Sequence, residues 1–183
     1  AFELARKRNR QKKLMLVDKA NAIRAQDIWP RTFAEVGEEF PDIEQDHAYV
    51  DAACMWMIKN PESFDTVVTT NLFGDIITDL GAVLQGGMGV AASGNIHPGQ
   101  VSMFESIHGS APKYKGKNVS CPVAAIAAVQ MMLDHLGEAG ASARVEGAIE
   151  SVLQAKDVTS VSASSGISTD EWGDRVVEKI RSL

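Results

Sequence analysis

The feature that most constrains the fold of this chain is an alternation of short apolar runs and amphipathic stretches along its 183 residues. The apolar runs have the length of buried strands, and the stretches between them carry apolar residues three and four positions apart. Chains of this kind form α/β folds. The expected strands are 13–17, 43–46, 66–70, 90–92 and 102–104, and the expected helices are 24–40, 50–58, 72–84, 124–136, 141–155 and 169–180.

Composition narrows the class of protein. Hydrophobic residues make up 45% and charged residues 23%, which is typical of a globular protein. A formal net charge of −6 argues against a nucleic-acid partner. No apolar run is long enough to span a bilayer, so we expect no membrane segment. Cys54 and Cys121 are interpreted as reduced thiols of a cytoplasmic protein. The first residues read as the middle of a helix, as in a fragment.

Two aspartates follow the predicted strand 66–70. On a helix, Asp75 and Asp79 lie on one face, where their carboxylates repel each other. A bridging cation removes that repulsion, and carboxylate oxygens with water suit Mg²⁺ or Mn²⁺. A solvated acidic face is the alternative. The metal interpretation is favoured because these residues follow a strand, at the sheet edge where α/β proteins bind ligands.

A lysine lies directly after the first predicted strand. Close to a metal ion, Lys19 could serve as a base or proton shuttle, although an ordinary surface lysine explains the segment equally well. Asp51 opens the helix after the second predicted strand, as either a third metal ligand or a favourable charge at a helix N-terminus. His47, His97 and His135 show no ligand spacing and are interpreted as structural or solvated.

A third segment, 105–114, combines polar side chains with small residues. Gly109 permits a close approach of a ligand, and His108 can stack or donate a hydrogen bond. The chain has neither a G-x-G-x-x-G nor a P-loop pattern, so this segment is the candidate nucleotide cradle. A plain turn between two elements is the alternative.

Together these segments resemble, in their order and spacing, the isocitrate/isopropylmalate dehydrogenase family. Residues 17–21 are similar to its lysine segment, 71–79 to its metal motif and 105–112 to its adenosine-binding loop. The resemblance covers nearly the whole chain. It implies a two-lobed α/β fold, truncated at the N-terminus, with residues 1–85 in the smaller, dimer-forming lobe and residues 86–183 in the cofactor lobe.

The resemblance also implies a chemistry. Asp75 and Asp79 would bind Mg²⁺ or Mn²⁺, and Asp51 would complete the site across the interface of a homodimer. Lys19, from the same subunit as Asp51, would help to take the hydroxyl proton of a small 2-hydroxy acid, with Asn21 near the nicotinamide. Oxidation by NAD(P) gives a 2-keto acid, and the metal polarises its carbonyl while CO₂ leaves.

The implied cofactor contacts include departures from the family pattern. Ser106 stands where proline is usual, and Cys121 where asparagine is usual. Lys113-Tyr114 is similar to NADP-linked isocitrate enzymes, in which a cation meets the 2′-phosphate. The choice of cofactor therefore stays open, with NAD named first and NADP as the alternative. The cofactor residues are Asn21, Glu105, His108, Gly109, Ser110, Ala111, Lys113, Tyr114 and Cys121.

Within the family, the motifs are most similar to members that oxidise isopropylmalate in leucine biosynthesis. Tartrate- or D-malate-oxidising and isocitrate- or homoisocitrate-oxidising members come second. A non-catalytic subunit of the superfamily predicts a degenerate metal site, whereas the three aspartates and Lys19 are all present. The family's substrate arginines and catalytic tyrosine belong upstream of residue 1, so we expect no turnover by this chain alone.

Overall fold

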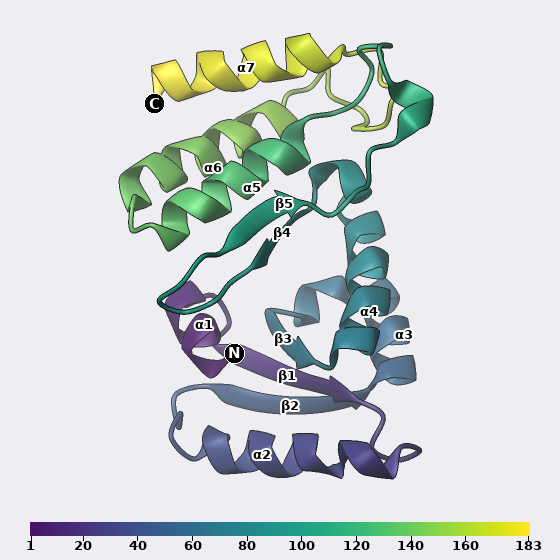
Figure 1. The fold of residues 1–183 in the computed structure, drawn as a ribbon, viewed down its shortest axis with the longest axis vertical. Coiled ribbons are helices and arrows are strands. Elements are labelled where there is room, and N and C mark those ends of the chain that lie inside the picture. The colour runs from purple at the N-terminus through teal and green to yellow at the C-terminus, as the bar shows by residue number, and fades with distance from the viewer. The chain divides into compact units, whose positions relative to one another are not determined.

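The computed structural model describes all residues, 1–183, and divides into two compact units, 1–84 and 85–183 (Figure 1). It has the expected α/β fold class. Which lobe each unit represents stays a prediction. The elements of unit 1 are α1 (Phe2–Arg8), β1 (Lys13–Asp18), a 3₁₀ turn (Arg24–Asp27), α2 (Ile28–Gly37), β2 (Glu44–Tyr49), α3 (Val50–Lys59), a 3₁₀ turn (Pro61–Ser63), β3 (Thr66–Thr69) and α4 (Asn71–Leu84).

A three-stranded parallel sheet forms the centre of unit 1. Its order is β2-β1-β3, so β1 hydrogen-bonds on both edges. Leu16 pairs with His47 and Val68, and Asp18 pairs with Tyr49. The chain leaves all three strands at the same edge, because they are parallel.

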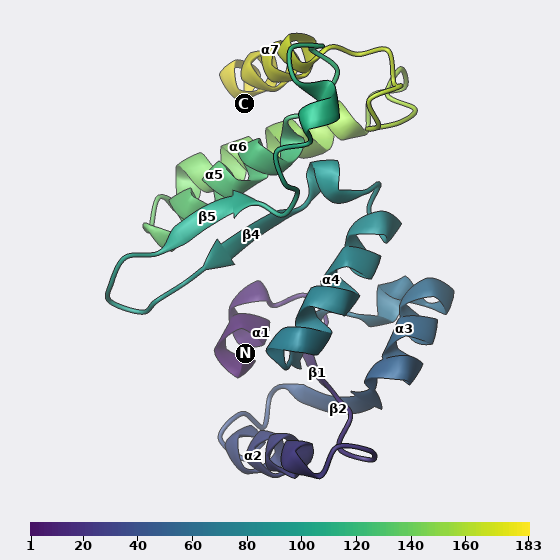
Figure 2. The ribbon, with the colours of Figure 1, turned by 45° about the vertical axis from the view of Figure 1, so that its right-hand side comes forward.

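The apolar run in β1 explains its central place. Residues 14–17 are all buried, as expected for a strand covered on both faces. Met15 and Val17 pack with α3 and α4, while Leu14 packs with Phe2 of α1 and with α2. Figure 2 shows α2 on one side of β1 and β2, with α3 and α4 on the other.

Unit 2 is a β-hairpin followed by three helices. Strands β4 and β5 pair antiparallel, with Ala92 opposite Ser106. Helix α5 packs on this hairpin and on α6, and α6 packs on α7. The elements are a 3₁₀ turn (Met88–Val90), β4 (Ala92–Asn95), β5 (Met103–Ser106), a 3₁₀ turn (Pro112–Tyr114), α5 (Val123–His135), α6 (Ala139–Leu153) and α7 (Thr169–Ser182).

The core of unit 2 forms around Trp172 of α7, which is fully buried. Cys121 and Val123 pack in the same cluster, as do Ala148 and Val152 of α6. The start of α7 is fixed by its cap, because the hydroxyl of Ser168 accepts the N–H of Glu171 at 3.2 Å.

Some sequence predictions of individual elements need correction. The strand expected at 90–92 is wrong, because Met88–Val90 is a 3₁₀ turn and the strand is Ala92–Asn95. The second strand extends to Tyr49 instead of ending at Asp46. The helix expected over 24–40 is α-helical only from 28 to 37. None of the helices has both the length and the apolar character that a membrane span requires.

Replacement of Trp172 by alanine removes the largest buried side chain of unit 2. We expect Trp172→Ala to lower the free energy of unfolding by about 3–5 kcal/mol, through lost burial and the cavity left behind. Val177 lies on the same helix but is exposed, so Val177→Ala serves as the control, with a change within about 0.5 kcal/mol. Denaturant unfolding followed by circular dichroism measures both. Equal effects would contradict the assignment of Trp172 to the core.

Candidate functional site

Charged residues gather where the strands of unit 1 end. Lys19 follows β1 directly, and Asp51 lies in the first turn of α3, directly after β2. Helix α4 follows β3 and carries Asp75 and Asp79. Parallel strands bring these segments to one edge of the sheet, which is where open α/β sheets bind their ligands.

Lys19 and Asp51 form an ion pair, in which the Lys19 ammonium donates to a carboxylate oxygen of Asp51. This hydrogen bond is the main reason that the pKa of Asp51 is lowered, and backbone N–H groups add to it. The Asp51 side chain is 69% exposed, so water screens the pair and it contributes little to stability.

The backbone around Lys19 is held from several directions. Its N–H donates to Oε1 of Gln26 at 2.7 Å, and its carbonyl accepts N–H groups of Ala22 and Ile23 at 3.0 and 2.9 Å. Asn21 lies exposed in the same turn. Lys19 and Asn21, which the sequence analysis assigns to proton transfer and the nicotinamide, thus share one fixed turn.

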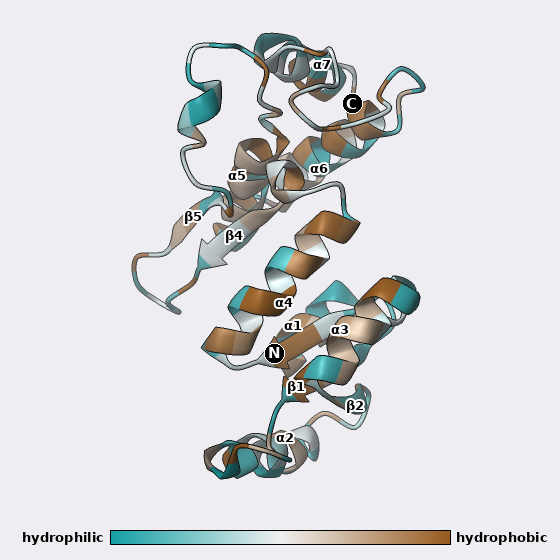
Figure 3. Ribbon diagram, turned by 90° about the vertical axis from the view of Figure 1, so that its right-hand side faces the viewer, coloured by the Kyte–Doolittle hydropathy of each residue, from teal (hydrophilic) through white to brown (hydrophobic).

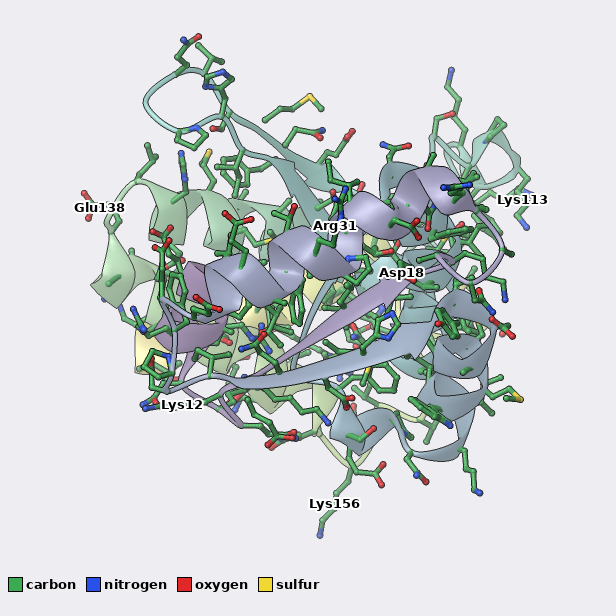
Figure 4. The ribbon with its side chains drawn as sticks, turned by 90° about the horizontal axis from the view of Figure 1, so that it is seen from below. Lys12, Asp18, Arg31, Lys113, Glu138 and Lys156 are labelled. Atoms are coloured by element: carbon green, nitrogen blue, oxygen red, sulfur yellow. The ribbon has the colours of Figure 1, made fainter.

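Asp18 and His47 lie near Lys19 and were not identified as site residues from the sequence. Asp18 is completely buried at the end of β1 (Figure 4), and its Oδ2 lies 3.1 Å from Nε2 of His47. The His47 ring meets the edge of Tyr49, and the Tyr49 ring centre lies 6.0 Å from the Lys19 ammonium. A charged residue inside the otherwise apolar run of β1 was the available sequence signal.

Asp75 and Asp79 are both exposed on α4. Leu72, Ile76 and Val83 are exposed too, and helical spacing places all five residues on one side of the helix. Nowhere in the single chain do three His, Cys, Asp or Glu side chains gather closely enough to hold a metal ion. The three predicted metal ligands are therefore not brought together within one chain.

Apart from Asn21, the predicted cofactor residues lie in unit 2. Glu105 on β5 lines a cavity of about 150 Å³ between β5 and α5. A ring N–H of His108 donates to the carbonyl of Gly109 at 2.9 Å, and Ser110 is exposed. Ala111 adopts a left-handed conformation with φ of 42°, which starts the 3₁₀ turn carrying the exposed Lys113. The Lys113 ammonium lies 4.7 Å above the ring of Tyr114.

Two features fix the end of this loop. Cys121 is buried in the unit 2 core, and burial raises the pKa of its thiol. Its assignment as a cofactor contact stays a prediction. Asn118 and Asp170 hydrogen-bond reciprocally, at 3.0 Å side chain to side chain and 3.2 Å from the Asp170 N–H. Thr169 adds a bond to the carbonyl of Ser120 at 2.7 Å, so the loop is tied to the start of α7.

Removal of the Lys19 ammonium tests the ion pair directly. We expect Lys19→Met to raise the pKa of Asp51 toward its usual range, as measured by carboxyl carbon NMR titration. Because the pKa of Asp51 is lowered in the folded state, its carboxylate stabilises the protein at pH values above the unfolded pKa of about 3.9. That stabilisation is lost as the pH falls through the folded pKa. The variant therefore loses less stability on acidification. Lys13→Met is the control: it raises the pKa of Asp46, its partner at 2.7 Å, and leaves Asp51 unchanged.

Comparison with known proteins agrees with this arrangement. The chain is 51% identical over 156 residues to a 3-isopropylmalate dehydrogenase of Frankia casuarinae, covering 84% of this chain and 45% of that protein. It is 45% identical over 185 residues to a 3-isopropylmalate dehydrogenase of Corynebacterium glutamicum, covering all of this chain and 52% of that protein. The chain thus spans about half the length of the curated relatives it matches.

A solved structure and a family profile extend the comparison. The crystal structure of isocitrate dehydrogenase from Methylococcus capsulatus superimposes with a TM-score of 0.90 at 39% identity, covering 98% of this chain and 53% of that one. The sequence profile described as isocitrate/isopropylmalate dehydrogenase matches residues 1–176. With the fold, the edge residues and these matches in agreement, the chain belongs to the isocitrate/isopropylmalate dehydrogenase family.

Proposed function

We propose that the protein containing this chain catalyses the oxidative decarboxylation of 3-isopropylmalate in leucine biosynthesis, with NAD as hydride acceptor and Mg²⁺ or Mn²⁺ as metal. The observation that carries the proposal is the Lys19–Asp51 ion pair at the carboxyl edge of a parallel sheet whose third strand leads into the aspartates of α4. Curated relatives 45–51% identical to the chain are named 3-isopropylmalate dehydrogenase.

Three aspartates supply the donors for the metal. Asp51, Asp75 and Asp79 offer hard carboxylate oxygens, the ligands that Mg²⁺ and Mn²⁺ prefer, and all three are exposed. Asp75 and Asp79 share one face of α4, so both can turn toward the same ion. When bound, such a cation polarises the oxygen atoms of a 2-hydroxy acid and of its keto product.

Lys19 is the proposed proton acceptor for the substrate hydroxyl, and it acts as the neutral amine, after its ammonium has given up a proton to water. Its fixed turn brings the amine to the same edge as Asp51, and Asp51 restrains the amine on one side. Catalysis gains from such restraint, because a base acts only within hydrogen-bond reach of the proton that it takes.

In the proposed site, Asp51 and the pair Asp75 and Asp79 come from two different copies of the chain. In α4 the aspartates lie in an otherwise apolar exposed stripe of Leu72, Ile76 and Val83, which are 65%, 53% and 67% exposed. Met55 and Ile58 of α3 are also exposed, and Figure 3 shows hydrophobic residues along both helices. A stripe of this kind favours contact with another protein surface. We infer a homodimer in which Asp75 and Asp79 of one subunit meet Asp51 and Lys19 of the other.

The segment 105–114 is the proposed adenosine site. Its backbone is shaped by the left-handed Ala111, and its side chains include the exposed Lys113, labelled in Figure 4. This lysine, above the Tyr114 ring, also suits a 2′-phosphate, so NADP is the alternative cofactor. Lys113 and the structural match to an isocitrate dehydrogenase together make isocitrate the second candidate substrate.

The test is turnover by the full-length protein containing this chain. With Mg²⁺, we expect reduced-cofactor absorbance to rise with 3-isopropylmalate and NAD, and to rise less with isocitrate or D-malate. Removal of the metal with EDTA abolishes the rate, and added Mn²⁺ restores it. Faster turnover of isocitrate with NADP would instead identify Lys113-Tyr114 as the better guide to substrate and cofactor. Absence of turnover in every combination would contradict the enzymatic assignment.

A charge in the apolar stripe tests the homodimer. We expect Ile76→Lys in the full-length protein to shift the species from dimer to monomer, because each copy loses burial worth about 1.5–3 kcal/mol and gains a charge in the contact. Light scattering after size exclusion measures the mass, and activity should fall with it. Leu136→Lys changes another exposed apolar residue, directly after α5, and is the control. A stable dimer for Ile76→Lys would place the contact elsewhere.

A further inference from the structure

We propose that Asp18 and His47 form a positioning pair that holds the Lys19 ammonium on the Asp51 carboxylate. The proposal rests on the proposed function, in which Lys19 takes the proton of the substrate hydroxyl. It assigns a role to Asp18, a fully buried charged residue, and to the histidine that contacts it.

Both oxygens of Asp18 are used. Oδ1 accepts the N–H of Ala20 at 2.9 Å, and Oδ2 accepts from Nε2 of His47 at 3.1 Å. The ring nitrogen is the donor in the tautomer that carries its proton on Nε2. Buried polar pairs are a poor source of stability compared with well-packed apolar residues. The fold of β1 alone therefore does not explain why a carboxyl group occupies this position.

One route from Asp18 to Lys19 runs through the backbone. The Oδ1 contact with Ala20 closes the turn immediately after Lys19, while Gln26 holds the Lys19 N–H. The Cα of Lys19 is thereby fixed on both sides. Its side chain must leave the turn in a restricted direction, toward the start of α3 where Asp51 lies.

A second route runs through two rings. His47 and Tyr49 are two residues apart on β2, so their side chains project from the same face of the sheet. Their rings meet edge to face at 5.0 Å, with an interplanar angle of 85°. The Tyr49 ring in turn lies beside the Lys19 ammonium. The hydrogen bond to Asp18 sets the His47 ring, and that ring limits where Tyr49 and the lysine can lie.

A second ion pair, on β1 and β2 themselves, lacks this support. Lys13, at the amino end of β1, contacts Asp46 at 2.7 Å and Glu44 at 3.8 Å. Asp46 also accepts the N–H of His47 at 2.8 Å, so the pair is best removed from the lysine side. Lys13→Met is therefore the control for any general loss of β1–β2 stability.

The experiment compares three variants of the full-length protein. His47→Leu removes the ring N–H and keeps the bulk, whereas His47→Gln restores a side-chain N–H donor. We measure kcat and KM with 3-isopropylmalate and NAD, the thermal midpoint, and the rate at which Lys19 is reductively methylated, read by mass spectrometry. The methylation rate reports the position of Lys19 without requiring turnover.

For His47→Leu we expect kcat to fall about 10- to 100-fold, because small displacements of a catalytic group have effects of this size. The KM for NAD should stay within about twofold, since the cofactor contacts are untouched. Lys19 methylation should become faster as the ammonium leaves Asp51. His47→Gln should recover most of kcat and the slow methylation, and Lys13→Met should change neither.

The outcomes separate this proposal from the proposed function. Unchanged kcat and methylation in His47→Leu, with only a lower thermal midpoint, would overturn the positioning role and leave the enzyme assignment intact. Failure of His47→Gln to recover either quantity would also overturn it, because the N–H donor would then be irrelevant. Faster methylation of Lys19 in His47→Leu, in a protein whose wild type turns over no 2-hydroxy acid, would support the positioning pair and reject the enzymatic assignment.

Discussion

The central position of β1 determines where every polar group of unit 1 can lie. Its apolar residues are buried on both faces and its two edges are hydrogen-bonded, so β1 has no freedom to shift its register without exposing that run. The first place where polar side chains can gather is its carboxyl end. Asp18 and Lys19 occupy that end, and the parallel neighbours bring Tyr49 and Asp51 beside them. The packing of β1 thus determines where the charged residues of the proposed site lie.

The charged groups at this edge differ sharply in burial. Asp18 is inaccessible to water, whereas the Asp51 side chain is mostly exposed. A buried group with fixed partners contributes geometry, because its hydrogen bonds tolerate little displacement. An exposed group remains available to a ligand. The edge therefore combines a rigid inner layer with an outer layer that can bind, which is the arrangement that a site for a small anionic substrate requires.

Most of the helices and the central strand could be predicted from the sequence, because periodicity and apolar runs are local signals. Strand β4 could not: its sequence, Ala92-Ser93-Gly94-Asn95, has no strand preference, and it is extended because it pairs with β5. The contact of His47 with Asp18, 29 positions away, depends on the register of β1 and β2. The aspartate motif of α4 was visible as i, i+4 spacing, but its partners in a metal site are not set by local sequence.

The apolar stripe of α4 couples the two halves of the proposed site. Covering Leu72 and Ile76 with a second subunit also removes Asp75 and Asp79 from water, and burying two like charges is unfavourable unless an opposite charge is present. A divalent cation supplies that charge, and the other subunit's Asp51 supplies a further ligand. Metal binding and dimerisation then stabilise each other by the same free energy, since coupling between two binding equilibria is reciprocal. In a monomer Asp75 and Asp79 are ordinary exposed residues, whereas in the proposed dimer they would make assembly depend on the proposed ion.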